Sequence, residues 1–285
     1  MVRGWLVLAV QLVVGAPVAH TQDTGAAEEE KSLAEIDRQL NNPLTSLWSL
    51  TFQDNLGIKE GDAIEGSGYT NVLFFQPALP VPVGEKLVFI GRPVFPLATG
   101  PDIDLQAQEV EGHVTGFGDI QVLSLVGPSR VSGWVWGLGP TFKFPTASEP
   151  QLGSGKYQIG PAAMAINMGK PWVWGFLVQH WESVGGDDQR SETSQTDLQY
   201  IVRYSLPGAW SVGSGPSITI DWEAESGERV TFPVGLGVTK TVRMGSLPVK
   251  LRAEVHYSII RPETFGEVWN FRFQITPVIK SPFGS

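Results

Sequence analysis

Apolar and polar residues alternate with a period of two along most of the chain, from Thr45 to Lys280. This spacing is typical of β-strands that present one face to an apolar environment and the other face to water. It is clearest in the last segment, whose apolar face carries Trp269, Phe271, Phe273 and Ile275. The positions between them are Asn270, Arg272, Gln274 and Thr276. Residues 249–261 repeat the pattern, so this part of the chain is predicted to be all-β.

Clusters of Gly, Pro, Asp and Ser divide the alternating region into twelve predicted strands. The strands are expected at residues 46–56, 69–78, 86–97, 117–126, 133–145, 157–168, 172–183, 196–206, 210–223, 230–243, 249–261 and 269–280. Long and short connections alternate, although 224–229 is brief for a long one. Outer-membrane barrels have an even strand number, short periplasmic turns and longer outer loops. The sequence therefore predicts a single antiparallel, transmembrane, up-and-down β-barrel with both termini in the periplasm.

The connections differ in composition as well as in length. The short ones are rich in Pro, Gly or Ser and lie at 79–85, 127–132, 169–171, 207–209 and 244–248. The long ones are mostly polar and lie at 57–68, 98–116, 146–156, 184–195 and 262–268.

Tryptophan marks the strand starts. Trp134, Trp172 and Trp210 follow one another at intervals of 38 residues, which suits a repeated hairpin, and each stands just after a short turn. We expect these three, with Trp269, to form an aromatic girdle at the membrane interface. The alternative is a soluble sandwich with these tryptophans buried between two sheets, but it does not need so many strands of membrane-spanning length.

The N-terminal region differs from the rest. Residues 1–19 have a basic start, an apolar run and small residues, and predict a signal peptide. Residues 20–44 are acidic and contain a short helix pattern in which Leu33, Ile36 and Leu40 share one face. This segment is either a periplasmic arm or a plug on the barrel mouth. Residues 45–285 form the barrel domain.

The composition supports a surface that water covers only in part. Charged residues make up 17% of the chain, whereas Gly (33 residues) and Trp (10 residues) are abundant, so the outer surface is expected to contact membrane lipid. The net charge of −9 and the lack of a basic stripe argue against nucleic acid as a partner. The absence of cysteine excludes disulfides and thiolate metal sites.

Several segments resemble a known family. The block GWVWGLGPTFKFPTASEPQLGSGKYQIGPAA that begins at Gly133 is the most specific, and the stretches at 40–48, 178–188 and 221–224 add to it. From about Leu33 to its end, the chain resembles the bacterial outer-membrane proteins described as the MetA-pathway of phenol degradation, or as transporters. The resemblance implies an outer-membrane barrel that imports small molecules, aromatic or hydrophobic compounds among them. The barrel-assembly machinery usually recognises a terminal aromatic, whereas here Phe283 is followed by Gly284 and Ser285.

The polar faces of the strands are predicted to line the lumen. The charged residues on these faces are Lys143, Arg203, Asp221, Glu223, Lys250, Arg252, Glu254, His256 and Arg272. Charges enclosed by a barrel must be paired or wetted, so mutual neutralisation is one role. A constriction that selects polar or anionic solutes is the other, with Arg203, Arg252 and Arg272 at its narrowest point. The two roles are compatible in the same residues.

An enzyme is the weakest interpretation. His256 and Ser258 share a face and resemble the His-x-Ser of outer-membrane phospholipases, but Ile259 and Ile260 replace the Asn-Gly of that family. Asp187 and Asp188 belong to a predicted solvated loop, which does not by itself indicate a metal site. We therefore expect no enzyme activity, no cofactor and no metal. The predicted function is a passive channel for small-molecule solutes, and the alternative is a structural or adhesive barrel with a plugged lumen.

Overall fold

The computed structural model describes residues 32–36, 47–104, 107, 109–129 and 132–282. The strands are β1 (Leu47–Glu60), β2 (Gly68–Val83), β3 (Leu87–Asp104), β4 (Glu109–Phe117), β5 (Ile120–Pro128), β6 (Gly133–Phe144), β7 (Lys156–Met168), β8 (Trp172–Gly186), β9 (Ser194–Leu206), β10 (Trp210–Ser214), β11 (Ser217–Asp221), β12 (Val230–Met244), β13 (Leu247–Ile260) and β14 (Gly266–Lys280). A 3-10 turn, η1 (Pro150–Leu152), lies between β6 and β7. Every strand pairs antiparallel with its neighbours.

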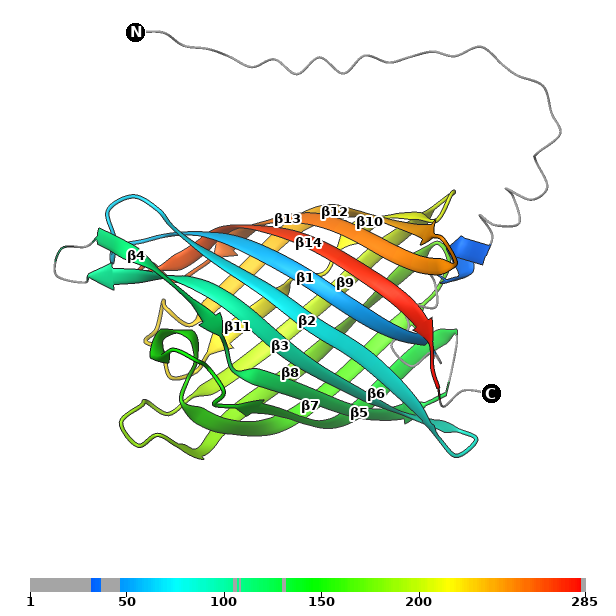
Figure 1. The fold of residues 1–285 in the computed structure, drawn as a ribbon, viewed down its shortest axis with the longest axis horizontal. Helices are drawn as coiled ribbons and strands as arrows, with labels where there is room; N and C mark the ends of the chain where they lie inside the picture. The colour runs from blue at the N-terminus through cyan, green and yellow to red at the C-terminus, as the bar shows by residue number, and fades with distance from the viewer. Residues whose placement is uncertain (1–31, 37–46, 105–106, 108, 130–131, 283–285) are drawn as a thin grey trace, which may run out of the picture.

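The sheet closes on itself because β1 pairs with both β2 and β14. Strands β4 and β5 follow one another along β3, and β10 and β11 together fill the position between β9 and β12. The fourteen segments therefore occupy the twelve positions of a closed barrel, and the predicted fold class is confirmed. Figure 1 shows the strands crossing the barrel at a steep tilt, as closure requires.

The two ends of the barrel differ in their connections. The turn end holds 84–86, 169–171, 207–209 and 245–246, and there β5 ends and β6 begins. The loop end holds 61–67, 145–155, 187–193, 222–229 and 261–265, and there β3 ends and β4 begins. The first strand begins and the last strand ends at the turn end, on the right in Figure 1. Connections at the turn end are short and most connections at the loop end are longer, as the sequence predicts. The hairpin between β3 and β4 is the exception, because only four residues separate Asp104 from Glu109.

Several predicted boundaries were wrong. Much of the predicted long connection 98–116 is strand, because β3 runs on to Asp104 and pairs there with β4. The predicted strand 117–126 is interrupted between β4 and β5, and 210–223 is interrupted at Gly215 and Pro216. Asp221 is the last residue of β11, so Glu223 lies in a loop instead of a strand.

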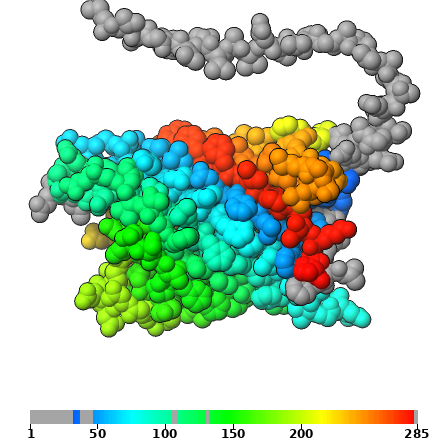
Figure 2. Space-filling model, in the orientation of Figure 1, coloured from blue at the N-terminus to red at the C-terminus, as the bar shows by residue number. Residues whose placement is uncertain are grey.

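Large apolar side chains cover the outside of the barrel. Phe52, Phe273 and Ile275 on two neighbouring strands are each about half exposed, and Phe52 stacks on Phe75 with 4.8 Å between ring centroids. The face in Figure 2 is a continuous wall of side chains from β1, β2, β3, β13 and β14. An apolar outer surface of this extent is what a barrel needs to lie in lipid. A polar pair interrupts it, where the Asn71 amide donates to the Asp54 carboxylate over 2.9 Å.

One side of the interior carries a large apolar patch. Val88, Leu125, Val135, Met164, Ile166 and Val173 on β3, β5, β6, β7 and β8 belong to one buried apolar cluster that faces the lumen. Charged and amide side chains face the lumen from β9, β13, β14 and β1. The prediction that polar faces line the lumen therefore does not hold at this apolar patch.

Little of the N-terminal region lies within the described residues. Residues 32–36 form a short helix that includes Leu33 and Ile36 and lies at the turn end (Figure 1). Leu40, the predicted signal peptide at 1–19 and the terminal Phe283 lie outside the described residues. No helix within the described ranges has the length and apolar character to cross a membrane.

Candidate functional site: the barrel lumen

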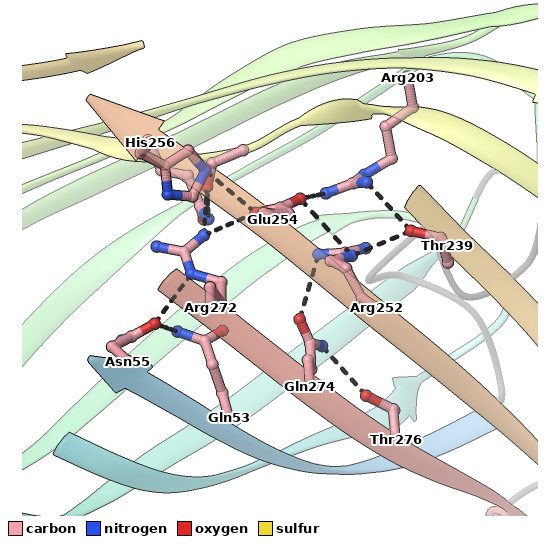
Figure 3. A network of polar contacts seen from close by, with 12 residues as sticks. Gln53, Asn55, Arg203, Thr239, Arg252, Glu254, His256, Arg272, Gln274 and Thr276 are labelled. Atoms are coloured by element: carbon pink, nitrogen blue, oxygen red, sulfur yellow. Dashed lines mark hydrogen bonds and ion pairs between the residues drawn. The ribbon is translucent and has the colours of Figure 1, made fainter. Parts of the chain in front are cut away.

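A buried carboxylate, Glu254 on β13, is surrounded by three arginines and a histidine from β9, β13 and β14 (Figure 3). Its Oε1 lies 2.7 Å from Nη2 of Arg203 on β9, and its Oε2 lies 3.2 Å from Nη1 of Arg272 on β14. Arg252 Nε is 3.8 Å from Oε1, and His256 Nε2 is 3.4 Å from Oε2. The side chains of Glu254 and Arg203 are 0% and 3% exposed, so this ion pair is desolvated and its partners depend on each other.

Several arginine N–H groups that do not bond to Glu254 donate to neutral side chains and to one backbone carbonyl (Figure 3). The Thr239 hydroxyl accepts from Arg203 Nη1 and from Arg252 Nε, both at 3.3 Å. Arg252 Nη1 also donates to Gln274 over 3.2 Å. Arg272 Nε donates to Asn55 Oδ1 over 3.0 Å, and its Nη1 donates to the Gly215 carbonyl over 2.9 Å. The interruption between β10 and β11 thus exposes a backbone acceptor that anchors Arg272.

Opposite this polar wall lies an apolar one. In the order of the sheet, β7 stands halfway around the barrel from β14. A cavity of about 410 Å³ separates the two walls. Its apolar lining includes Ile90, Leu123, Leu125, Met164, Ile166 and Leu177, and its polar lining includes Gln53, Arg203, Arg252, Arg272 and Gln274. The inner cavity is therefore amphipathic.

Arg92 on β3 was not predicted as a lumen residue. It lines the inner cavity beside Ile90 and Val94, and its Nε is buried without a hydrogen-bond partner. No ion pair to Arg92 occurs among the described residues. Both faces of residues 86–97 are largely apolar, so the alternation of apolar and polar residues did not indicate which face points inward. The arginine was itself a signal, because a charged residue in a membrane-spanning segment is expected to face the interior.

A second cavity of about 600 Å³ opens at the loop end, and we call it the mouth cavity. Its lining includes Lys143, Asp221 and Glu223, three of the predicted lumen residues. The two carboxylates are exposed, so they belong to the entrance and not to the enclosed lumen. Phe74 and Gln121 line both cavities, and this pair marks the place where the mouth cavity adjoins the inner one.

Trp181 fills the interior near the mouth and is 0% exposed. Lys143 Nζ lies 3.9 Å from the centre of the Trp181 ring and donates to Gln195 over 2.8 Å. This arrangement places a cation on an aromatic face in a site with little water, where such contacts are strongest. Trp181 thus packs inside the barrel and is not part of a lipid-facing girdle.

An ion pair between buried Lys156 and exposed Glu192 holds the loop between β8 and β9 against β7. Lys156 Nζ lies 2.8 Å from Glu192 Oε1, and the Ser183 hydroxyl donates to the other carboxylate oxygen. These two donors, Lys156 first, hold the pKa of the Glu192 carboxyl below its ordinary value of 4.5. The contact therefore stabilises the loop above that pH, and the stabilisation is lost as the pH falls through the lowered pKa.

We expect amide hydrogen exchange in residues 187–193 to accelerate, beyond the intrinsic pH effect, when the pH is lowered from neutral to well below 4.5. The Glu192→Gln variant should exchange fast at both pH values, because its amide carries no charge for Lys156. Equal pH dependence in the two proteins would show that the pair does not hold this loop.

The remaining predicted site residues are spread over the barrel. Lys250 is buried near the turn end of β13. Trp134, Trp172 and Trp210 face outward at the turn end, and Trp134 contacts Trp174 edge to face at 4.9 Å. Trp269 also faces outward but lies near the loop end, where it packs on Tyr257 at 4.9 Å. The proposed girdle residues therefore belong to two rings.

Catalytic and metal chemistry find little support in the geometry. His256 and Ser258 are both buried, and no hydrogen bond joins them in the described part of the chain. The Asp187 carboxylate accepts a hydrogen bond from the backbone N–H of Gln189, and the Asp104 carboxylate accepts one from the backbone N–H of Ala107. Both carboxylates therefore cap turns in the backbone. Within the described ranges, no three His, Asp or Glu side chains gather as metal ligands would.

Comparisons with known proteins identify the fold but no family. No family model and no curated protein sequence matches the chain. The structure is similar to the crystal structure of an outer membrane channel from Pseudomonas putida F1, with a TM-score of 0.59 and 13% sequence identity over 81% of this chain and 93% of that chain. A Pseudomonas aeruginosa FadL homologue gives a TM-score of 0.42 and 9% identity, over 86% and 94% of the two chains. The beta domain of the Bordetella autotransporter BrkA gives a TM-score of 0.39 and 11% sequence identity, over 81% of this chain and 98% of that chain. The fold is thus that of outer-membrane β-barrels.

Proposed function

We propose that this protein is an outer-membrane channel for the passive uptake of small molecules, with both termini in the periplasm and the loop end at the cell surface. The observation that carries the proposal is that two cavities adjoin each other, one at the mouth and one inside the barrel. The mouth cavity of about 600 Å³ and the inner cavity of about 410 Å³ share the lining residues Phe74 and Gln121. A structural barrel gains nothing from leaving its interior unfilled, since side chains can pack a barrel of this size.

The outer surface supports the membrane placement. Exposed aromatic and aliphatic side chains cover the strands, and tryptophans stand near both ends, where the lipid interface would lie. Such a protein would contact outer-membrane lipid and depend on the barrel-assembly machinery. The likeness to the Pseudomonas putida F1 channel supports the fold on which this function depends.

Single-channel recordings in planar bilayers test the proposal. We expect the full chain, refolded and reconstituted, to show discrete conductance steps and to let small neutral solutes swell liposomes. A protein that inserts but neither conducts nor passes solutes would instead be the structural or adhesive barrel with a plugged lumen.

Phe74 is expected to restrict the passage between the two cavities. Its side chain lines both of them, so Phe74→Ala should join the cavities and increase the single-channel conductance. The matched control is Phe75→Ala on the same strand, because Phe75 faces outward and stacks on Phe52. Unchanged conductance in Phe74→Ala, or an equal increase in both variants, would show that Phe74 does not form the constriction.

A further inference from the structure

The strongest unexplained feature of the lumen is Arg92. Its guanidinium group is always charged, its Nε is buried without a partner, and its neighbours on the inner face of β3 are the apolar Ile90 and Val94. An unpaired cation next to apolar side chains is costly. Because the cavity in front of it is open, an anionic group of a solute can supply the missing partner.

The charge of the whole cavity favours the same occupant. Four arginines and one aspartate line it: Arg92, Arg203, Arg252, Arg272 and Asp197. Glu254 lies behind the lining and pairs with Arg203 and Arg272. Guanidinium groups therefore outnumber carboxylates by two around this space, and Arg92 lies apart from the Glu254 network, on another wall.

The apolar wall determines what the rest of the solute must be. Leu123 and Leu125 on β5, Met164 and Ile166 on β7, and Leu177 on β8 line the same cavity as Arg92. A water-filled channel for ions or sugars does not need such a wall, whereas an apolar molecular body is stabilised by it. A volume of about 410 Å³ lies within the usual range of small-molecule sites.

We propose that the inner cavity binds small organic carboxylates with an aromatic or branched apolar body, and that Arg92 holds the carboxylate while the wall of β5, β7 and β8 holds the body. The inference rests on the proposed channel function and names the solute class of that channel. A carboxylate fits because its two oxygens match the guanidinium fork. A neutral molecule of the same shape leaves Arg92 unpaired and binds less tightly.

Binding of naphthalene-2-carboxylate and of its neutral isostere, naphthalene-2-carboxamide, to the purified full-length barrel tests the proposal at neutral pH. We expect the carboxylate to bind about tenfold to a hundredfold more tightly than the carboxamide. Acetate, which has the charge but no apolar body, should bind far more weakly than the naphthalene compound. Equal affinity for the carboxylate and carboxamide would overturn the proposal.

Two variants separate the two halves of the site. Arg92→Gln should remove the preference for the carboxylate and leave carboxamide binding unchanged, whereas Leu125→Ala should weaken both compounds. Arg243→Gln, at an exposed position of the turn end, is the charge-matched control and should bind like the original protein. A preference that persists in Arg92→Gln would assign the anion to another arginine and overturn the role of Arg92. If Arg92→Gln does not fold, the comparison of the two naphthalene compounds on the unmodified protein still decides the solute class.

Liposome swelling with a neutral sugar distinguishes this inference from the channel function. Sugar uptake without a carboxylate preference would leave the channel intact and refute the solute class. No uptake, together with selective carboxylate binding, would refute the channel and leave an anion-binding barrel.

Discussion

Replacing Glu254 with glutamine is expected to lower the free energy of unfolding by about 3–5 kcal/mol, because it leaves a buried guanidinium group without its counter-charge. The Arg203 side chain is 3% exposed and lies 2.7 Å from the carboxylate, so water cannot replace the lost partner there. Arg272, at 3.2 Å, loses its ion pair with Glu254 at the same time, although it keeps its hydrogen bonds to Asn55 and the Gly215 carbonyl. Urea unfolding of the refolded barrel, followed by tryptophan fluorescence, measures the change.

Glu223→Gln is the matched control for that experiment, since Glu223 is exposed at the mouth and its replacement should change the free energy of unfolding by less than about 0.5 kcal/mol. The double variant Arg203→Met and Glu254→Gln should recover part of the stability, because it removes the stranded cation as well. Equally small losses in the two single glutamine variants would show that lumen water solvates the arginines and that Glu254 does not hold the wall together.

The barrel could be predicted from the sequence because a strand with lipid on one face and a polar lumen on the other has to alternate. Strands β13 and β14 meet this condition, and their predicted inward residues Arg252, Glu254 and Arg272 meet in the structure at one carboxylate. Closure of the barrel also constrains the number of strands, because the edge of every strand must pair with a neighbouring strand. The twelve strand positions therefore followed from the period and the turns.

The amphipathic lumen could not be predicted in the same way. On β3, inward Val88, Ile90 and Val94 alternate with outward Phe89 and Phe95, and an apolar residue does not reveal which face it takes. The period of two carries information only where the two faces differ in polarity. Arg92 was hidden for this reason, and so was the interior apolar wall with which it shares the cavity.

The position of Trp181 could not be decided from its residue type, because a tryptophan near the outer rim of a barrel can face either the lipid interface or the lumen. Its position on the chain has the same parity as Val173, Leu177 and Gln179, which all face inward from β8. The alternation along β8 could be read from the sequence. The packing of Trp181 under Lys143 could not, because it depends on β6, which lies two strands away, and on the adjacent β9.

Replacing Trp181 with alanine is expected to cost about 3–5 kcal/mol of the free energy of unfolding, the range for emptying a large buried aromatic site. The side chain is 0% exposed, and its ring also supports the Lys143 ammonium group at 3.9 Å. The space it leaves lies inside the barrel near the mouth, so we also expect a larger single-channel conductance. Urea unfolding and bilayer recordings on one preparation measure both effects.

Trp181→Phe is the closest control, because phenylalanine keeps one aromatic ring in the site. Trp181 Nε1 has no hydrogen-bond partner, so the substitution breaks no hydrogen bond. Its destabilisation should therefore be well below that of Trp181→Ala, and its conductance should stay near the original value. Trp174→Ala on the same strand removes an outward-facing ring whose edge-to-face partner is Trp134, and it should cost about 1 kcal/mol without widening the lumen. If Trp174→Ala were as costly as Trp181→Ala, or if it alone raised the conductance, the assignment of Trp181 to the interior of the channel would be wrong.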